Sequence, residues 1–375
     1  MKKYIFTILL YSISMSGYSL HTKGGWMYYE YLGPGLVNPA FNRYKITLKL
    51  YMICNPNSGQ LDQSVNFSIF NPNTNVLISN DPVPIADNVN IQNCFAPSCN
   101  PCISNLPNIC YKIVTYDLVK EFASNPEGYR ISYSRCCRIP GINNVVNSSN
   151  VGDTWSINIP GTQITSVAPM NSSPKFIAND TAVICAEHPF TFEFTARDPN
   201  SDSLVYAFAP AYTGASAAAP NPGTADNPPQ SIPYQFPYTA SQPMGAAVTI
   251  DPATGIVSGI APPSGIYVLC AVVKEYRNGV YIGEARKSLH IQVASCIPIQ
   301  ATLDPEYITC GDFTRSFSNA TPSSNITSYF WIFGDPASGT NDSSQLANPT
   351  HTYSDTGVFQ LTMIVNRGQA CSDTA

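Results

Sequence analysis

The chain has 375 residues, of which 11% are charged and 44% are hydrophobic, and it contains 32 prolines, 22 tyrosines and 12 cysteines. Soluble domains average about 25% charged residues, so this composition excludes a typical helical cytosolic protein and is typical of extracellular β-proteins. The formal net charge of −5 and the absence of a Lys/Arg cluster argue against nucleic acid or an anionic membrane as a partner.

Residues 1–20 have the pattern of a secretory signal peptide. Residues 1–3 are Met-Lys-Lys, residues 4–15 are mainly apolar, and small or polar residues follow at 16–19 near a plausible cleavage point. The apolar part is too short for a stable transmembrane helix, and no later stretch reaches the roughly 18 apolar residues that a span needs. We therefore expect a secreted or cell-surface protein whose signal is cleaved and that does not insert into the membrane.

The cysteine content fits this export route, because disulfides persist outside the cytoplasm. Cys99 and Cys102 have the spacing of a zinc-ligand pair, but the chain has only four histidines and none lies in that region. We therefore favour disulfides over a zinc site, without predicting a full connectivity. The disulfide candidates that we single out are Cys54, Cys136, Cys137, Cys185, Cys270, Cys296, Cys310 and Cys371.

Residues 21–166 are expected to form an N-terminal, cysteine-rich β domain. Apolar residues alternate with more polar ones in residues 44–51, which predicts a strand with one buried face made by Tyr44, Ile46, Leu48 and Leu50. Further strands are expected at 65–70, 111–116, 129–134 and 154–159, and one or two helical turns at 118–123.

Two features of this domain allow sharper expectations. Cys136 and Cys137 are adjacent, and neighbouring side chains on an extended segment point to opposite faces, so we expect them to bond to two different partners. The aromatic residues Trp26, Tyr28, Tyr29 and Tyr31 are either a contact platform for a ligand or part of the buried face of a strand.

Three segments of this domain carry a resemblance: GGWMYYEYLGPG (24–35), NRYKITLKLYMIC (42–54) and GYRISYSRCCRIPGINN (128–144). Together they resemble the N-terminal region of large surface proteins of Bacteroidetes that contain PKD domains, are exported by the type IX system and are associated with gliding motility. Where that pattern has polar residues, this chain has Met52-Ile53 and Ile139. The resemblance therefore implies a structural role for these positions and no chemistry.

Residues 167–297 are expected to form an immunoglobulin-like domain. Short strands alternate with Asp/Pro/Gly turns at 190–208 and 248–276, and Asn278-Gly279 is a strong signal for a hairpin tip. The segments ARDPNSDSLVY (196–206) and IDPATGIVSG (250–259) resemble the cadherin-like or putative-Ig modules of large bacterial surface proteins. The Pro-, Ala- and Gly-rich segment 210–241 is expected to be either a flexible lid or an exposed contact surface.

Residues 298–375 carry the most specific resemblance in the chain. The segments SYFWIFGD (328–335), NPTHTY (348–353) and GVFQLTMIV (357–365) resemble a PKD domain, a small β-sandwich. The resemblance implies that Trp331 and Phe333 fill the core and that Gly334-Asp335 makes a turn, and it suggests that Cys310 bonds to Cys371. A last strand is expected after Ala375, so the domain is expected to be truncated. The matching motif residues are Trp331, Phe333, Gly334, Asp335, Pro349, His351, Tyr353 and Gly357.

One pattern indicates a metal site. Asp198, Asn200 and Asp202 place oxygen donors at every second residue, as calcium requires, and the cadherin-like resemblance favours calcium. The same residue types also build turns without an ion, because Asp and Asn side chains accept hydrogen bonds from nearby backbone N–H groups. Calcium is the one cofactor that the sequence points to.

No catalytic motif is present, and each of the four histidines is interpreted as structural, because no nucleophile and orienting acid accompany it. The sequence therefore predicts an all-β protein of tandem Ig-like sandwiches, the last a PKD domain, that acts as a non-catalytic structural or adhesive display module within a larger adhesin. The alternative is an ancillary binding region of a secreted enzyme that degrades polysaccharide or protein. The expected partners are an extracellular glycan, a protein ligand or components of the cell envelope.

Overall fold

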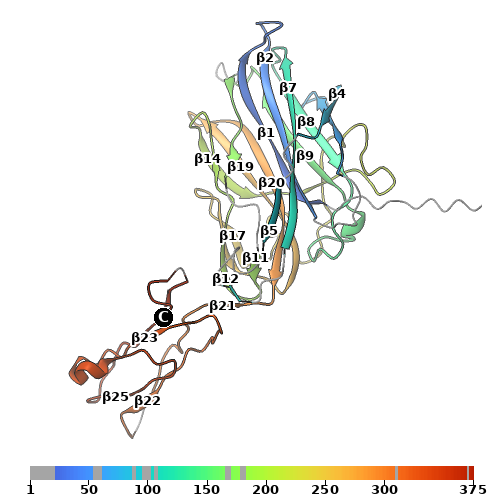
Figure 1. Cartoon of the computed structure of the whole chain (residues 1–375). Helices are drawn as coiled ribbons and strands as arrows, with labels where there is room; N and C mark the ends of the chain where they lie inside the picture. The colour runs from blue at the N-terminus through green and yellow to red at the C-terminus, as the bar shows by residue number, and fades with distance from the viewer. Residues whose placement is uncertain are drawn as a thin grey trace, which may run out of the picture.

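The computed structural model describes residues 22–53, 61–86, 90–94, 103–104, 109–164, 170–177, 183–308, 311–369 and 371–375. Among these residues the regular structure is almost entirely β-strand, joined by turns and loops, and the only helices are short 3-10 turns such as η1 (Ser148–Asn150) and η3 (Pro336–Asp342). Figure 1 shows the strands gathered into a large body with a smaller C-terminal unit at one end. The predicted all-β fold class of tandem sandwich-like units is confirmed.

The largest sheet has eight strands and draws on both of the first two predicted domains. They are β1 (Thr22–Pro34), β2 (Asn42–Ile53), β5 (Asn90–Cys94), β7 (Ile109–Phe122), β11 (Val183–Cys185), β14 (Ser203–Phe208), β19 (Gly265–Arg277) and β20 (Val280–Ala294). The order is β14-β19-β20-β1-β2-β7-β5, and β11 pairs in parallel with β20. The sheet therefore continues across the boundary predicted near residue 166, through the pairing of β1 with β20.

We call the contact between these two parts the junction. It consists of residues 24–26 of β1 paired with residues 287–289 of β20, and of residues 171–173, which bond to Tyr29 and Tyr31 of β1. Lys287 at the junction is fully buried, and its Nζ atom lies 5.7 Å from the ring centre of Phe176. The positions of the domain boundaries stay predictions, but the first two units share a sheet and a core.

A second sheet covers one face of the first. Its strands are β3 (Ser64–Phe70), β4 (Leu77–Pro84), β8 (Gly128–Arg135) and β9 (Asp153–Pro160), in the order β4-β3-β8-β9. One continuous core joins side chains of both sequence halves, such as Leu48 and Phe67 with Val273 and Ile291. Figure 1 shows β8 and β9 lying beside β1 and β2.

The alternation in β2 has the predicted effect, since Tyr44, Ile46, Leu48 and Leu50 are all buried. The helical turns predicted at 118–123 are wrong. That segment is the end of β7, where Leu118 pairs with Ile46 and Phe122 with Asn42. A full-length partner strand decides the conformation here, because pairing and burial outweigh local propensity in sheets.

Smaller sheets complete the second unit. Their strands are β10 (Lys175–Phe176), β12 (Pro189–Glu193), β13 (Ala196–Arg197), β15 (Tyr212–Thr213), β16 (Gln230–Ser231), β17 (Val248–Ile250) and β18 (Ile256–Ile260). The sheets are β10-β13, β12-β18-β17 and β15-β16. The hairpin between β19 and β20 turns at Asn278 and Gly279, both with positive φ, as the Asn-Gly signal predicted.

The segment 210–241 is neither a lid nor wholly exposed. The backbone N–H of Ala225 donates to Ser68 Oγ at 2.8 Å, and that of Asp226 donates to Ser134 Oγ at 3.0 Å. Ala225 and Ile232 are buried. The segment is therefore packed against the first unit and adds to the contact between the two.

The C-terminal unit begins where β21 (Ile297–Pro298) pairs with β6 (Ile103–Ser104). Its other strands are β22 (Thr314–Ser316), β23 (Tyr329–Ile332), β24 (Ser343–Ser344), β25 (Thr350–Thr352), β26 (Thr362–Val365) and β27 (Asp373–Thr374), in the sheets β22-β25 and β24-β23-β26-β27. Trp331 and Phe333 are buried at its centre, as the resemblance implied.

Two expectations about cysteines are corrected. Cys136 and Cys137 bond to each other instead of to different partners. Their peptide bond is cis and their Cα atoms are 3.0 Å apart, so the segment is not extended there and the two side chains do not alternate. Cys270 is a free buried thiol and not a disulfide partner, because it points into the apolar cluster around Val268 and Val272.

The remaining cysteine predictions have mixed outcomes. Cys185 bonds to Cys296 within the second unit. Cys371 takes part in a disulfide, while Cys310 and Cys54 lie outside the described residues. None of the helices in the described part of the chain is long and apolar enough to cross a membrane.

Candidate functional site

The predicted calcium residues lie in the turn between β13 and β14. Asp198 Oδ1 accepts hydrogen bonds from the backbone N–H groups of Asn200 at 2.8 Å and of Asp202 at 2.9 Å. Ser201 between them has a φ of 64°. The Asp side chain therefore shapes the turn through hydrogen bonds to its own backbone.

The fold brings a third carboxylate to this turn. Glu275 of β19 lies with Asp198 and Asp202 such that one oxygen of each is within 4.8 Å of the others. Glu275 is 1% exposed, and its carboxyl group shares a hydrogen bond with that of Asp198. We call Asp198, Asp202 and Glu275 the carboxylate cluster.

Burial and mutual repulsion set the charge of this cluster. Burial raises the pKa of Glu275 to about 8, and the nearby Asp198 carboxylate adds to the effect. Burial likewise raises the pKa of Asp198. Asp202 is compensated directly, because Arg277 Nη2 lies 2.6 Å from Asp202 Oδ2 and Nε donates to Oδ1 at 2.7 Å.

The cluster is connected to the junction through Asn171, which is fully buried. Its Nδ2 group donates to Glu275 Oε1 and to the hydroxyl of Tyr29 on β1, and its Oδ1 atom accepts from Arg277 Nη2 at 2.7 Å. The neighbouring Ser172 N–H donates to Asn200 Oδ1 at 2.8 Å. One hydrogen-bond network therefore joins the turn, β19 and β1.

Of the three predicted ligands, Asp198 and Asp202 lie in the carboxylate cluster. Asn200 Oδ1 accepts a hydrogen bond from the backbone N–H of Ser172 at 2.8 Å. Glu275 was missed by sequence reasoning, although a signal was present. It lies two residues after Val273 and therefore on the same buried face of an otherwise apolar strand, where a carboxylate is unusual.

The described histidines have structural partners. His351 Nε2 lies 3.3 Å from Asp335 Oδ2, and its ring stacks on Phe333 with ring centres 4.2 Å apart. His290 Nε2 lies 3.3 Å from Arg138 Nη1, and His188 Nδ1 lies 2.7 Å from the backbone oxygen of Ala186. His21 lies outside the described residues.

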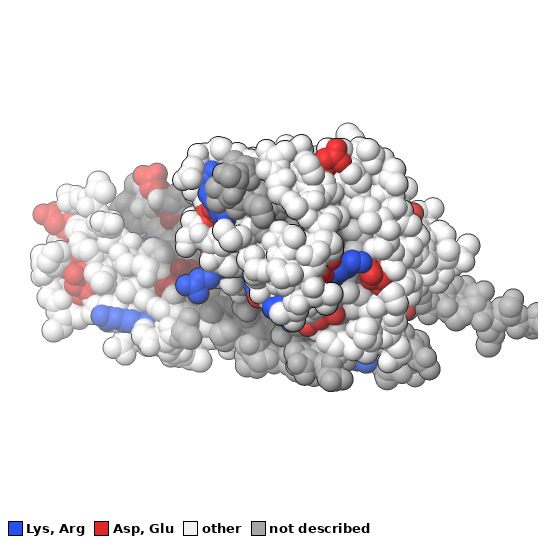
Figure 2. All heavy atoms as spheres, turned by 90° about the horizontal axis from the view of Figure 1, so that it is seen from above, with Lys and Arg blue, Asp and Glu red and all other residues white. Residues whose placement is uncertain are grey.

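The aromatic residues near the N-terminus are mostly core. Trp26 and Tyr29 are buried, whereas Tyr28 and Tyr31 are partly buried and pack against the same core. The interpretation as a strand face is therefore favoured over a contact platform. On the face in Figure 2, Lys and Arg side chains are scattered, and some lie beside Asp or Glu, without a continuous patch of one sign.

The motif residues of the C-terminal unit form its core and one turn. Trp331 Nε1 donates to the backbone oxygen of Leu346 at 2.9 Å, and Asp335 accepts hydrogen bonds from the N–H and hydroxyl of Ser354. These bonds lower the pKa of Asp335. Gly334 has a φ of 73° and a Cβ there would lie 2.5 Å from Gln360 O, so only glycine fits. The remaining motif residues are Pro349, whose carbonyl accepts from Phe317 N–H, the partly buried Tyr353, and the exposed Gly357.

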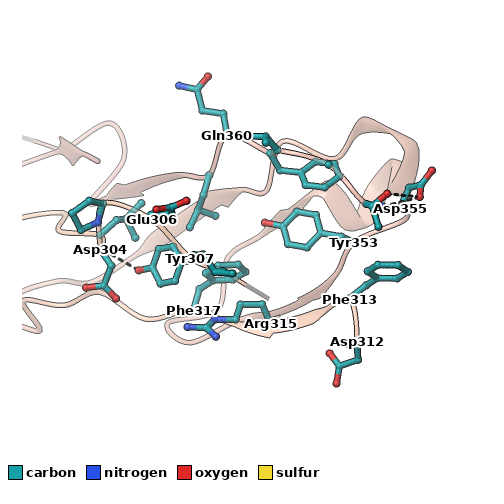
Figure 3. A pocket seen from close by; sticks show the side chains of 18 residues that line it. Asp304, Glu306, Tyr307, Asp312, Phe313, Arg315, Phe317, Tyr353, Asp355 and Gln360 are labelled. Carbon is teal, nitrogen blue, oxygen red and sulfur yellow. Dashed lines mark hydrogen bonds between the residues drawn. The ribbon is translucent and has the colours of Figure 1, made fainter. Parts of the chain in front are cut away.

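A hollow of about 730 Å³ opens in this unit. In Figure 3 the hydroxyl of Tyr353 points toward the side of the pocket where Tyr307 lies, while the hydroxyl of Tyr307 accepts a hydrogen bond from the backbone N–H of Asp304 at 3.1 Å. The carboxylates that line it are Asp304, Glu306, Asp312 and Asp355, and the one cationic side chain is Arg315. Phe313 at its edge is 47% exposed. We call this hollow the acidic pocket.

Residues 358–361 border the acidic pocket and lead directly into β26, which pairs with β27. Arg315 Nε is buried without a partner, and the guanidinium lies 5.5 Å from the ring centre of Tyr307. The pocket therefore combines aromatic surface with excess negative charge.

Comparison with known proteins identifies this unit. Residues 297–375 match the family model of the PKD domain. No curated protein matches the chain. A solved structure described as "Structural basis for Dscam isoform specificity" is 9% identical, with 89% of this chain and 78% of that chain covered, at a TM-score of 0.17. A similarity of this size supports no inference about function. The acidic pocket, in contrast, lies wholly within the PKD domain.

Proposed function

We propose that this chain is an exported, non-catalytic binding and display module that belongs to a larger adhesin of the bacterial cell surface. The observation that carries the proposal is the acidic pocket of the PKD domain, which is open and lined by aromatic and carboxylate side chains. Concave sites with a few placed polar groups are where ligands bind. The resemblance of the N-terminal segments to exported Bacteroidetes surface proteins supports the same setting.

The chemistry of the pocket favours a polypeptide ligand over a glycan. Four carboxylates against one guanidinium favour a basic segment, and the aromatic rings of Tyr307 and Tyr353 suit cationic or apolar side chains. We therefore propose a protein ligand with an exposed basic segment.

The remainder of the chain would present this pocket. The eight-stranded sheet unites the first two units into one body, and the disulfide between Cys185 and Cys296 closes that body next to β21. Folded β-sandwiches that carry binding loops at an end are a common arrangement for display. This role requires no catalytic group.

The experiment is binding of the labelled chain, without its signal, to peptide and glycan arrays. Phe313→Ala removes an exposed ring at the pocket, and Glu306→Lys reverses one of its charges. Phe236→Ala is the matched control, because Phe236 is an 88% exposed ring outside the pocket.

We expect binding to basic peptides that both pocket variants weaken at least about tenfold, with Phe236→Ala unchanged. Equal loss in all three variants, binding restricted to glycans, or no binding on either array would overturn the assignment of the pocket. Hydrolysis of an arrayed compound would overturn the non-catalytic role.

A further inference from the structure

A groove of about 210 Å³ lies where the first two units meet. Strands β8 and β9 of the first unit contribute lining residues, as do the segment 210–241 and β20 of the second unit. We call it the arginine groove, and its polar lining residues are Arg130, Ser156, Asn158, Tyr212, Glu284 and Arg286. The groove exists only because the two units fold against each other.

Arg130 is fixed in this groove by acceptors from three different parts of the chain. Its Nε donates to Asn158 Oδ1 at 3.3 Å, and its Nη2 donates to the backbone oxygen of Pro72 at 3.1 Å. Its Nη1 donates to Oδ1 of Asn75 at 2.8 Å and to Oδ1 of Asn227 at 3.1 Å. The protein has therefore already met the entropic cost of ordering this long side chain before any ligand arrives.

All of these acceptors are neutral, so the charge of Arg130 is unbalanced. In the described part of the chain Arg130 forms no ion pair. The side chain is partly buried, and burial lowers its pKa, although an arginine stays charged at neutral pH. A fixed, partly buried cation without a counter-ion calls for an anionic ligand.

The second arginine of the groove does not change this balance. Arg286 Nη2 lies 2.9 Å from Glu284 Oε1, so these two charges compensate each other. The lining thus keeps one net positive charge, in a chain whose formal net charge is −5. Of the five N–H donors that each guanidinium has, Arg130 uses four and Arg286 uses three, which leaves donors for a carboxylate.

The other lining groups favour a saccharide over an acidic peptide. The hydroxyls of Ser156 and Tyr212 both donate and accept hydrogen bonds, as sugar hydroxyls do. Pro228 and Pro229 add rigid apolar surface for the C–H face of a sugar ring. Glu284 would repel the second carboxylate of an acidic peptide, whereas it can accept a hydrogen bond from a sugar hydroxyl.

We propose that the arginine groove binds a carboxylate-bearing sugar residue of an acidic polysaccharide. Arg130 would donate to the carboxylate, and Ser156 and Tyr212 would exchange hydrogen bonds with hydroxyls of the ring. This inference goes beyond the proposed function, because the groove shares no lining residue with the acidic pocket.

The test is calorimetric titration of the full chain with tetragalacturonate, in which every ring carries a carboxylate. Maltotetraose, a neutral saccharide, and the peptide tetraglutamate are the comparison ligands. Arg130→Gln removes the unbalanced charge, whereas Asn158→Asp gives Arg130 a carboxylate partner of the same size from within the protein. Arg197→Gln is the matched control, since Arg197 is exposed on β13 and outside the groove.

We expect wild type and Arg197→Gln to bind tetragalacturonate, more weakly as NaCl is added. Both groove variants should bind it at least about tenfold more weakly, because a charge-assisted hydrogen bond to the ligand is lost. Asn158→Asp should melt at or above the temperature of wild type, since its new carboxylate pairs with Arg130. Its loss of binding would then not be due to unfolding.

A wild-type protein that binds no tetragalacturonate would overturn the proposal, as would binding that survives in both groove variants. Equal binding of maltotetraose would refute the role of charge, and equal binding of tetraglutamate would refute the choice of a saccharide. Phe313→Ala should leave tetragalacturonate binding unchanged. A loss in that variant would place the saccharide in the acidic pocket instead, so the two proposals can fail separately.

Discussion

Gly24 of β1 pairs with Leu289 of β20, and a Cβ atom at Gly24 would lie 2.1 Å from the backbone oxygen of Ser288. The two strands are separated by more than 250 positions of the sequence and approach this closely only because residue 24 lacks a side chain. Its φ of 126° is also a conformation that L side chains rarely adopt. The close contact of the first two units therefore depends on this glycine.

We predict that Gly24→Ala lowers the free energy of unfolding by about 2–5 kcal/mol, because it strains the backbone and clashes with β20 at the junction. Gly33→Ala on the same strand is the control. Gly33 also has a positive φ, of 108°, but a Cβ there meets nothing within 4 Å. Gly33→Ala should therefore lower the free energy of unfolding by only about 1–2 kcal/mol. Denaturant unfolding measures the stability of both variants. Equal losses of stability would show that the cost at Gly24 comes from backbone strain alone and not from the clash with β20.

A second prediction concerns Cys270, the free thiol in the described part of the chain. Burial raises its pKa to about 11, and the residue is 2% exposed. Since the thiolate is the reactive form, maleimide labelling of Cys270 at mildly alkaline pH should be at least about a hundredfold slower in the native protein than in denaturant. Mass spectrometry of the peptide that contains Cys270 measures this rate. Rapid native labelling would contradict the packing seen here.

The sequence allowed the local features of the fold to be predicted, because they follow from neighbouring residues. The Asn278-Gly279 hairpin, the alternating face of β2 and the Asp198 turn are all present. The aromatic core of the PKD domain around Trp331 also follows from a contiguous motif.

Features that depend on distant pairing could not be predicted. The junction pairs residues near 25 with residues near 288, and no local pattern specifies such a partner. Glu275 joins Asp198 only through the register of β14 on β19. The pairing of Cys136 with Cys137 escaped prediction because the alternation rule assumes an extended trans backbone.

A third prediction concerns acid sensitivity at His290. Burial, together with the nearby cations Arg138 and Lys23, holds the pKa of this side chain well below its ordinary value of 6.5. The unfolded chain therefore binds a proton below about pH 6.5 that the native state does not. The stabilisation from the neutral histidine is therefore complete above about pH 6.5. Below this pH it declines by about 1.4 kcal/mol for each pH unit.

His290→Gln keeps a hydrogen-bond acceptor for Arg138 and removes the titration. Its free energy of unfolding should change less between pH 7 and pH 5 than that of wild type, by about 1–2 kcal/mol. Urea unfolding across this range measures the difference. Parallel pH profiles for the two proteins would show that His290 does not titrate on unfolding.

The last prediction separates the PKD domain from the rest of the molecule. Trp331 is fully buried between Phe317 and Met363, and its Nε1 group donates to Leu346 O. Trp331→Ala should destabilise this domain by about 3–5 kcal/mol, because a large side chain is lost from a packed core. Trp331→Phe keeps a ring and loses the hydrogen bond, so it should cost about 1–3 kcal/mol.

The readout is hydrogen exchange at β23 and β26, compared with β1 and β20 in the same sample. Because β21 and β6 provide the only strand pairing between the C-terminal unit and the described remainder of the chain, exchange should quicken in β23 and β26 alone. Faster exchange in β1 as well would show that the two parts unfold together. The PKD domain would then be an integral layer of the fold, and it could not present its pocket as an independently stable unit.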